Sequence, residues 1–169
     1  MNNMLYIVTG PAGVGKSTIS KKLASIKDKS ALIEGDDIYN QVIGGYVYPW
    51  LEGNHLEIFW EVCYKTITTY LNNGYDVVFN YIIEPEDLDM LKDMFKDYNM
   101  KFVALLVDEQ TLISRDKQRD EDSQMNERCI ELLEEFKSYN YDEKYIIDTS
   151  KISIENIVDI INNEDRFMI

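Results

Sequence analysis

The sequence predicts an α/β fold in which five parallel strands form one sheet with helices on both faces. Short apolar runs alternate five times with longer segments whose apolar residues recur at helical spacing, a pattern typical of parallel sheets with right-handed crossover helices. The 169 residues are enough for one sizeable core and few for two ordinary domains, so we expect a single domain over residues 1–169. The most distinctive motifs directly follow the apolar runs, at the strand ends where such sheets bind ligands.

Five apolar runs are the predicted strands, because a short apolar run bounded by turn residues is typical of a strand buried on both faces. They are residues 4–9, 31–34, 76–83, 101–107 and 144–148.

Seven segments between and after these runs are predicted helices. They are residues 16–26, 36–42, 54–72, 85–95, 110–118, 129–136 and 154–161. Pro85 suits the first position of its helix, Ser153 and an Asp at the start of 36–42 suit N-caps, and Gly74 suits the end of 54–72. Residues 46–53 are irregular and rich in aromatic side chains.

The charge balance, the first residues and the two cysteines limit which binding partners and which cellular compartment we expect. Lys and Arg number 17 against 31 Asp and Glu, a net charge of −14, which argues against a protein that grips the phosphate backbone of a nucleic acid. The start lacks a basic segment before its apolar run, and no apolar stretch is long enough for a membrane span. Cys63 and Cys129 fall inside helical patterns, as buried thiols of a reducing compartment do. We therefore expect a cytoplasmic monomer or homodimer without membrane or nucleic-acid partners.

The segment Gly10-Pro11-Ala12-Gly13-Val14-Gly15-Lys16-Ser17 fits the phosphate-loop pattern G-x-x-x-x-G-K-[ST] at every fixed position. It follows a predicted strand and opens a predicted helix, which is the context that the motif requires. Glycines let backbone N–H groups approach phosphate, and the helix N-terminus favours negative charge. We expect residues 10 and 12–18, including Thr18, to bind ATP. Lys16 would reach the β- and γ-phosphates and Ser17 would ligate Mg²⁺.

Two acidic residues, Asp36 and Asp37, follow the second predicted strand about twenty residues beyond the loop. A carboxylate at this edge can accept a proton from an attacking hydroxyl or hold a magnesium-bound water. Asp36 is the favoured candidate for base and metal contact, and either residue can contact the substrate. The alternative is that one of them only caps the next helix.

The phosphate loop, a short second strand ending in Gly-Asp and a later Arg-x-x-x-Arg segment together resemble the AAA-type small P-loop kinases. This superfamily includes gluconate kinase, shikimate kinase, chloramphenicol phosphotransferase, zeta-toxin and polynucleotide-kinase-like enzymes. The resemblance spans nearly the whole chain and matches no single member. It implies a three-layer P-loop NTPase fold with strand order 2-3-1-4-5, ATP as phosphoryl donor, a small lid, and Asp36 as base or substrate anchor.

Arg115 and Arg119 lie in the segment expected to form the lid, about residues 115–126. A guanidinium binds phosphate in a bidentate manner and can neutralise charge on the transferred phosphoryl group. Both arginines are therefore candidates for ATP binding and catalysis. The alternative is an exposed helix with Arg–Asp pairs of little energetic value.

The segment expected to contact the phosphoryl acceptor, residues 30–91, contains few cations and several aromatic residues. Between residues 30 and 91 there are eleven acidic residues, one lysine and no arginine, so an anionic acceptor would be poorly bound there. The third predicted strand has Asn80 at the position where a Walker B acid is expected. The Asn80 amide can hydrogen-bond a magnesium-bound water or the substrate. Flat or apolar acceptors suit aromatic walls. The other candidate substrate contacts are Tyr39, Tyr48, Trp50 and His55, each of which can instead serve packing or a local hydrogen bond.

These features predict an ATP- and Mg²⁺-dependent kinase that phosphorylates a hydroxyl of a small neutral or cationic molecule. The acceptor would be a nucleoside, a sugar, an amino sugar or an antibiotic-like alcohol. One alternative is a nucleotide-hydrolysing switch protein, although no Asn-Lys-x-Asp guanine signature occurs in the sequence. The other is a zeta-toxin-like kinase of a sugar nucleotide, against which the missing arginines count.

Overall fold

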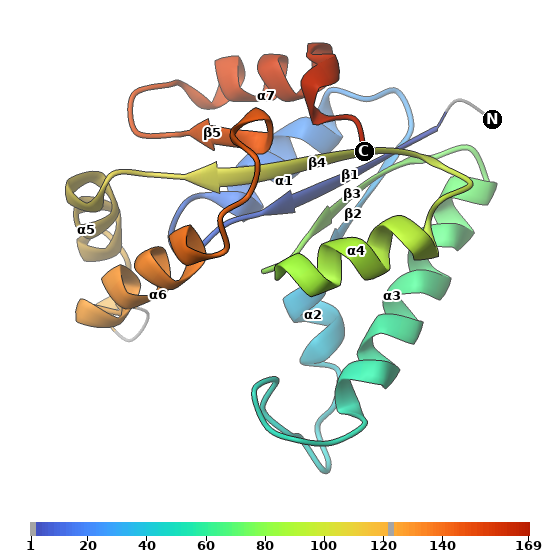
Figure 1. Ribbon diagram of the computed structural model, residues 1–169, viewed down its shortest axis with the longest axis horizontal. Coiled ribbons are helices and arrows are strands. Elements are labelled where there is room, and N and C mark those ends of the chain that lie inside the picture. Colours follow the sequence, from blue (N-terminus) through green and yellow to red (C-terminus); the bar gives the residue numbers. More distant parts are fainter. Residues whose placement is uncertain (1–2, 122–123) are drawn as a thin grey trace.

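The computed structural model describes residues 3–121 and 124–169, and its centre is a sheet of five parallel strands (Figure 1). The spatial order β2-β3-β1-β4-β5 confirms the P-loop NTPase arrangement expected from the sequence. The strand bounds are β1 (Met4–Thr9), β2 (Ser30–Glu34), β3 (Asp76–Asn80), β4 (Asn99–Leu106) and β5 (Ile146–Asp148).

Helices cover both faces of the sheet (Figure 1). Their bounds are α1 (Lys16–Ser25), α2 (Gly35–Tyr39), α3 (His55–Asn72), α4 (Pro85–Met94), α5 (Glu109–Lys117), α6 (Glu127–Ser138) and α7 (Ile154–Asn163). One core lies between the sheet and α1 and α7, and the other lies between the sheet and α2, α3 and α4. The helices α5 and α6 stand at the carboxyl ends of the strands (Figure 1).

The central strand β1 contributes side chains to both cores, because successive side chains of a strand point to opposite faces. Leu5 and Ile7 pack toward α3 and α4, whereas Tyr6 and Val8 pack toward α1 and α7. All four side chains are buried. This explains why the predicted strands are continuous apolar runs and not alternating ones.

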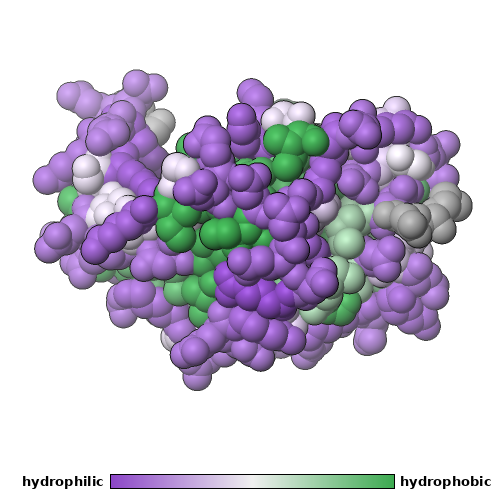
Figure 2. All heavy atoms as spheres, turned by 90° about the horizontal axis from the view of Figure 1, so that it is seen from above, coloured by the Kyte–Doolittle hydropathy of each residue, from purple (hydrophilic) through white to green (hydrophobic). Residues whose placement is uncertain are grey.

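The surface on the α7 side is largely hydrophilic, with apolar residues gathered in its middle (Figure 2). The apolar side chains Ile157, Val158 and Ile161 of α7 are buried, while the polar residues of this helix are mostly exposed. In the described part of the chain no helix combines the length and apolar character needed to cross a membrane.

Several predicted strand bounds were wrong. The strand β2 begins one residue and β4 two residues earlier than expected, and β4 ends one residue early, at Leu106. The bounds of β3 and β5 differ for local reasons. The segment 144–148 begins with a 3-10 turn (Glu143–Tyr145), in which the Asp142 carboxylate accepts the Lys144 N–H, so β5 starts only at Ile146. The strand β3 ends at Asn80, not at Ile83, because the Ile83 N–H donates to the buried Thr9 hydroxyl and leaves the strand ladder. Ile83 still packs in the core, which is why the apolar run continues past the strand.

Caps and helix ends were predicted with mixed success. Pro85 is the first residue of α4, Ser153 caps α7 through the Asn156 N–H, and Gly74 follows α3 with φ of +82°. The expected Asp N-cap of the second helix was wrong, because Glu34 precedes the helix and the two aspartates lie in its first turn. This helix also ends at residue 39, short of the expected 42.

Four residues of interest to the sequence predictions lie outside the described part of the structure. They are Met1 and Asn2 at the N-terminus, and Asp122 and Ser123 within the expected lid.

Gly35, the first residue of α2, is predicted to be sensitive to an added methyl group. A Cβ at this position would lie 2.5 Å from the Tyr81 ring, and overpacking of this kind typically costs about 1–3 kcal/mol. We expect Gly35→Ala to lower the free energy of unfolding, measured by urea denaturation, by that amount.

The matched control for this prediction is Gly44→Ala, since an added Cβ at Gly44 meets nothing within 4 Å. We expect a change within about 0.5 kcal/mol for this exposed position. Equal effects of the two substitutions would contradict steric contact with Tyr81 as the cause.

Candidate functional site: a phosphate loop between two cavities

The phosphate loop connects β1 to α1 and depends on glycines with positive φ. Gly10, Gly13 and Gly15 have φ of +151°, +86° and +105°, a region that favours glycine. At Gly10 a Cβ would lie 2.6 Å from the Leu105 carbonyl oxygen, so the loop packs directly against β4. Gly15 is the N-cap of α1. The loop therefore ends at a helix N-terminus, where backbone N–H groups attract anions.

Lys16 folds back over the loop. Its Nζ donates to the carbonyl oxygens of Gly10, at 2.8 Å, and Pro11, at 3.0 Å. Burial of the ammonium lowers the pKa of Lys16 to about 8; the charge of Asp36 opposes this shift and that of Arg119 adds to it. The ammonium thus has loop carbonyls as partners that an arriving phosphate group can replace.

A cavity of about 530 Å³ lies against this loop. It brings together most of the residues that the sequence assigned to nucleotide, including both arginines of the expected lid, but Gly10 does not line it. The remaining wall comes from α1, the start of α2, the end of β3 and the segment after it, the turn after β5, and α7. The lining residues are Ala12, Gly13, Val14, Gly15, Lys16, Ser17, Thr18, Ile19, Asp36, Asn80, Ile82, Arg115, Arg119, Thr149, Ile152, Ile154 and Ile157.

Three oxygen-bearing side chains in this cavity fit a magnesium ion. Asn80 at the end of β3 donates an amide N–H to Ser17 Oγ at 3.2 Å, and Asp36 lines the same cavity. Mg²⁺ prefers oxygen ligands and is usually held by one or two protein groups plus substrate phosphates. A hydroxyl and one carboxylate beside a phosphate loop match this preference. Among residues 3–121 and 124–169 no three His, Cys, Asp or Glu side chains form a metal-binding group without a substrate.

The two arginines have different surroundings, although they lie about one helical turn apart. Arg115 Nη1 donates to the carbonyl oxygen of Val14 at 2.9 Å and to Thr149 Oγ1 at 3.1 Å, and its Nη2 donates to Thr149 O at 3.0 Å. Arg115 therefore ties the phosphate loop to the turn after β5. Arg119 instead pairs with Asp116, and its Nη2 would lie 3.6 Å from a Cβ placed on Gly13.

A second cavity, of about 620 Å³, adjoins the first. Ala12, Asp36 and Ile82 line both. The second cavity combines aromatic rings, apolar groups and acidic side chains. Its other lining residues are Pro11, Pro49, Trp50, Leu56, Trp60, Tyr81, Glu84, Asp87, Met125, Arg128, Leu132, Glu135, Phe136 and Tyr139.

The charge of this second cavity is negative. Of the described residues lining it, Asp36, Glu84, Asp87 and Glu135 are acidic and Arg128 is the one cation. Arg128 is itself paired with Glu131, with a 2.7 Å contact between Nη1 and Oε2. Burial raises the pKa of Glu84, and the charges of Asp87, Glu86 and Glu135 raise it further. The cavity therefore favours neutral or positively charged groups.

The candidate acceptor residues are distributed unevenly. Trp50 lines the second cavity and is 77% exposed, and Tyr48 stacks on it with ring centroids 4.8 Å apart. Tyr39 and His55 instead line a separate cavity of about 160 Å³, where the Tyr39 hydroxyl donates to the Val47 carbonyl oxygen at 2.6 Å.

Asp36 and Asp37 are both exposed, but Asp37 lines none of these three cavities. It therefore differs from its neighbour Asp36, which lies where the two larger cavities meet.

Several residues at the site were not found from the sequence. Trp60, Tyr81, Glu135 and Tyr139 line the acceptor-side cavity. Helical periodicity marks Trp60 as a core residue and gives no hint of a cavity. Thr149 differs from these residues, because the family resemblance already implied that the turn after the last strand lies near the adenine; it is buried and lines the nucleotide-side cavity.

A protein-family model described as an AAA domain matches residues 5–138. The chain belongs to this family. Together with the strand order, the match confirms the sequence-based resemblance to the P-loop kinase superfamily at the level of family and fold.

Solved structures share the fold of this AAA-domain chain at low sequence identity. The tunicamycin resistance protein of Deinococcus radiodurans is 15% identical with a TM-score of 0.69, covering 94% of this chain and 93% of its own. A gluconokinase of Sinorhizobium meliloti is 18% identical with a TM-score of 0.64, covering 94% and 89%. A sugar kinase of Janibacter sp. HTCC2649 is 14% identical with a TM-score of 0.66, covering 93% and 91%. This AAA-domain chain therefore has a kinase-like fold. The activities in the names above are those of the compared proteins.

Proposed function

We propose that the protein is an ATP-dependent kinase that transfers the γ-phosphoryl group to a hydroxyl of a small neutral or cationic molecule. The observation that carries this proposal is that two cavities meet at Asp36, one against the phosphate loop and one with aromatic walls. Phosphoryl transfer needs donor and acceptor in line on either side of the transferred group. A protein that only hydrolyses nucleotide needs no second cavity of this size.

The nucleotide would bind in the first cavity. The loop N–H groups and Lys16 would hold its phosphates, and Thr149, Ile152 and Ile154 would surround its base. Ser17 and Asp36 would hold Mg²⁺, with Asn80 supporting Ser17; the ion would supply charge neutralisation on the phosphate oxygens. Arg119 would face the transferred group across Gly13, while Arg115 keeps the loop in place.

The acceptor would bind in the second cavity with its hydroxyl toward Asp36. The carboxylate of Asp36 can accept the hydroxyl proton as the phosphoryl group is transferred. Trp50, Trp60 and Tyr81 offer aromatic walls, and the acidic side chains disfavour a substrate phosphate or carboxylate. Nucleosides, sugars, amino sugars and antibiotic-like alcohols meet these conditions, and sugar nucleotides do not.

The test follows ADP release from Mg·ATP with separate pools of neutral sugars, nucleosides, hydroxylated antibiotics including aminoglycosides, and anionic nucleotides with sugar acids. We expect stimulation by a neutral or cationic pool, lost in Lys16→Ala and retained in Lys21→Ala, an exposed lysine on the same helix.

Stimulation by the anionic pool alone would contradict the acceptor class. Nucleotide hydrolysis that no pool stimulates would contradict the kinase and favour a nucleotide-hydrolysing switch.

A further inference from the structure

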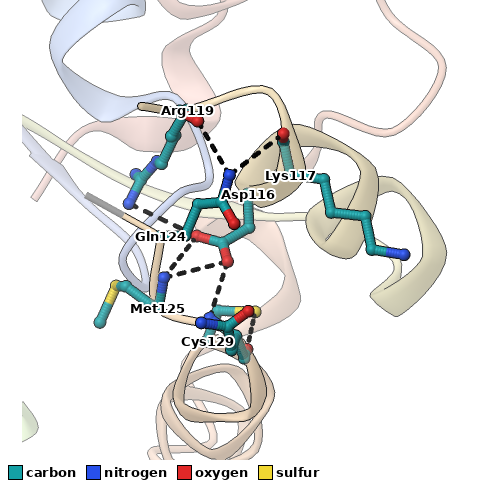
Figure 3. Close-up of polar contacts among 7 residues, drawn as sticks. Asp116, Lys117, Arg119, Gln124, Met125 and Cys129 are labelled. Atoms are coloured by element: carbon teal, nitrogen blue, oxygen red, sulfur yellow. Dashed lines mark hydrogen bonds and ion pairs between the residues drawn. The ribbon is translucent and has the colours of Figure 1, made fainter. Parts of the chain in front are cut away.

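Asp116, near the end of α5, is a carboxylate hidden from solvent at 3% exposure. Its carboxylate faces Met125, just before α6, and Arg119, just after α5 (Figure 3). A charge removed from water requires hydrogen bonds or an opposite charge. Asp116 has both kinds of partner.

The hydrogen bonds join Asp116 to the start of α6. The backbone N–H of Met125 lies 3.0 Å from Oδ2 and 3.1 Å from Oδ1, and the N–H of Asn126 donates to Oδ2 at 2.8 Å. These bonds lower the pKa of Asp116 below its usual value, and the bond from Met125 has the largest effect. The carboxylate therefore stays ionised at neutral pH and holds the end of the connection between α5 and α6.

The opposite charge comes from Arg119. Its Nη1 lies 3.7 Å from Asp116 Oδ1, and its backbone N–H donates to the carbonyl oxygen of Asp116 at 3.1 Å. Gln124 adds a further restraint, since its amide donates to the carbonyl oxygen of Arg119 at 3.0 Å (Figure 3). The guanidinium of Arg119 is thereby directed at the phosphate loop beside Gly13.

We propose that Asp116 is a positioning residue, which holds the guanidinium of Arg119 over the phosphate loop so that it meets the phosphates of the bound nucleotide. The inference rests on the proposed function for its effect on turnover, but its effect on nucleotide binding requires only that phosphates occupy the loop. Asp116 itself touches neither substrate in this arrangement. Its substitution acts through Arg119.

The test is a double-mutant cycle with Asp116→Asn, Arg119→Ala and the double variant. Asparagine keeps the shape and one acceptor oxygen of aspartate but loses the charge that faces Arg119. Two readouts are measured on the full chain: the affinity for the non-hydrolysable ATP analogue AMP-PNP with Mg²⁺, and kcat with an acceptor that stimulates ADP release. Asp120→Asn, an exposed carboxylate in the same segment, is the matched control.

We expect Asp116→Asn to lower kcat by roughly tenfold to a hundredfold, the size of effect that a small misplacement of a catalytic group produces. AMP-PNP affinity should fall as well. In the double variant neither quantity should fall below that of Arg119→Ala alone, because Asp116 has no effect once the guanidinium is removed. Asp120→Asn should match the wild type in both.

Losses that add in the double variant would overturn the proposal, since Asp116 would then act through the fold. An Asp116→Asn protein with unchanged affinity and kcat would overturn it as well. If Asp116→Asn does not fold, Asp116→Glu, which keeps the charge and moves it by one methylene, takes its place in the same cycle with the same criterion. If no acceptor supports turnover, the proposed function fails, and the AMP-PNP cycle still decides the role of Asp116.

Discussion

Replacing Asp36 by asparagine is expected to lower phosphoryl transfer by about 10²–10⁴-fold, the usual contribution of a positioned general base. Asp36 lines both the nucleotide-side and the acceptor-side cavity. Asparagine keeps the size of the side chain but cannot take the hydroxyl proton. Nucleotide affinity should fall far less than kcat, because the loop N–H groups, Lys16 and the Ser17 ligand to Mg²⁺ remain. The measurement is kcat with a stimulating acceptor, together with AMP-PNP affinity.

The matched control for this experiment is the adjacent residue. Asp37 lies in the same first turn of α2 and is exposed, so Asp37→Asn removes the same charge from nearly the same place. We expect this variant to retain phosphoryl transfer. If Asp37→Asn loses transfer and Asp36→Asn retains it, the assignment of the base is wrong.

Replacing Lys16 by alanine is expected to lower kcat by about 10²–10³-fold, the usual effect of removing one preorganised donor from a developing negative charge. The fold should survive, because the bonds that Lys16 makes are to Gly10 and Pro11 within its own loop. Thermal unfolding checks the fold and ADP release checks the rate. Wild-type turnover in Lys16→Ala would contradict the role of the loop.

The lowered pKa of Lys16 adds a pH dependence to nucleotide binding. Below its pKa of about 8 the ammonium is charged in the free protein, and affinity should not depend on the titration of this group. Above that pH the free protein carries neutral Lys16, whereas bound phosphates favour the charged form. Binding must then take up a proton, and affinity should fall by up to about tenfold per pH unit.

Calorimetric titration of AMP-PNP on either side of pH 8 measures this dependence. The dependence should be absent in Lys16→Ala. An equal decline in that variant would assign the effect to another group.

Local spacing made the nucleotide end of the site predictable. The phosphate loop requires glycines, a lysine and a serine within one strand–helix turn. The residues that bind phosphate are therefore consecutive in the sequence and can be recognised there. The sheet order followed from a family resemblance, and the alternation of apolar runs required a parallel sheet with two cores. The bounds of β3 and β5 were missed because Ile83 and the 3-10 turn at residues 143–145 depend on hydrogen bonds that apolar content does not reveal.

The two arginines show what spacing leaves undecided. In sequence Arg115 and Arg119 are equivalent candidates for the transferred phosphate. Packing separates them, because Arg115 meets Val14 and Thr149 while Arg119 meets Asp116. The acceptor-side cavity is likewise a tertiary feature, assembled from Trp60 in α3, the residues before α4 and Glu135 in α6.

The sequence by itself determined the fold class, the phosphate loop and the acidic character of the acceptor region, because each depends on residue type and local spacing. The tertiary structure decided which carboxylate joins the two cavities, which arginine is tied to the loop backbone and which pairs with Asp116, and which rings form the acceptor walls. These depend on how segments far apart in the chain pack together, and side chains one helical turn or one residue apart can face entirely different neighbours.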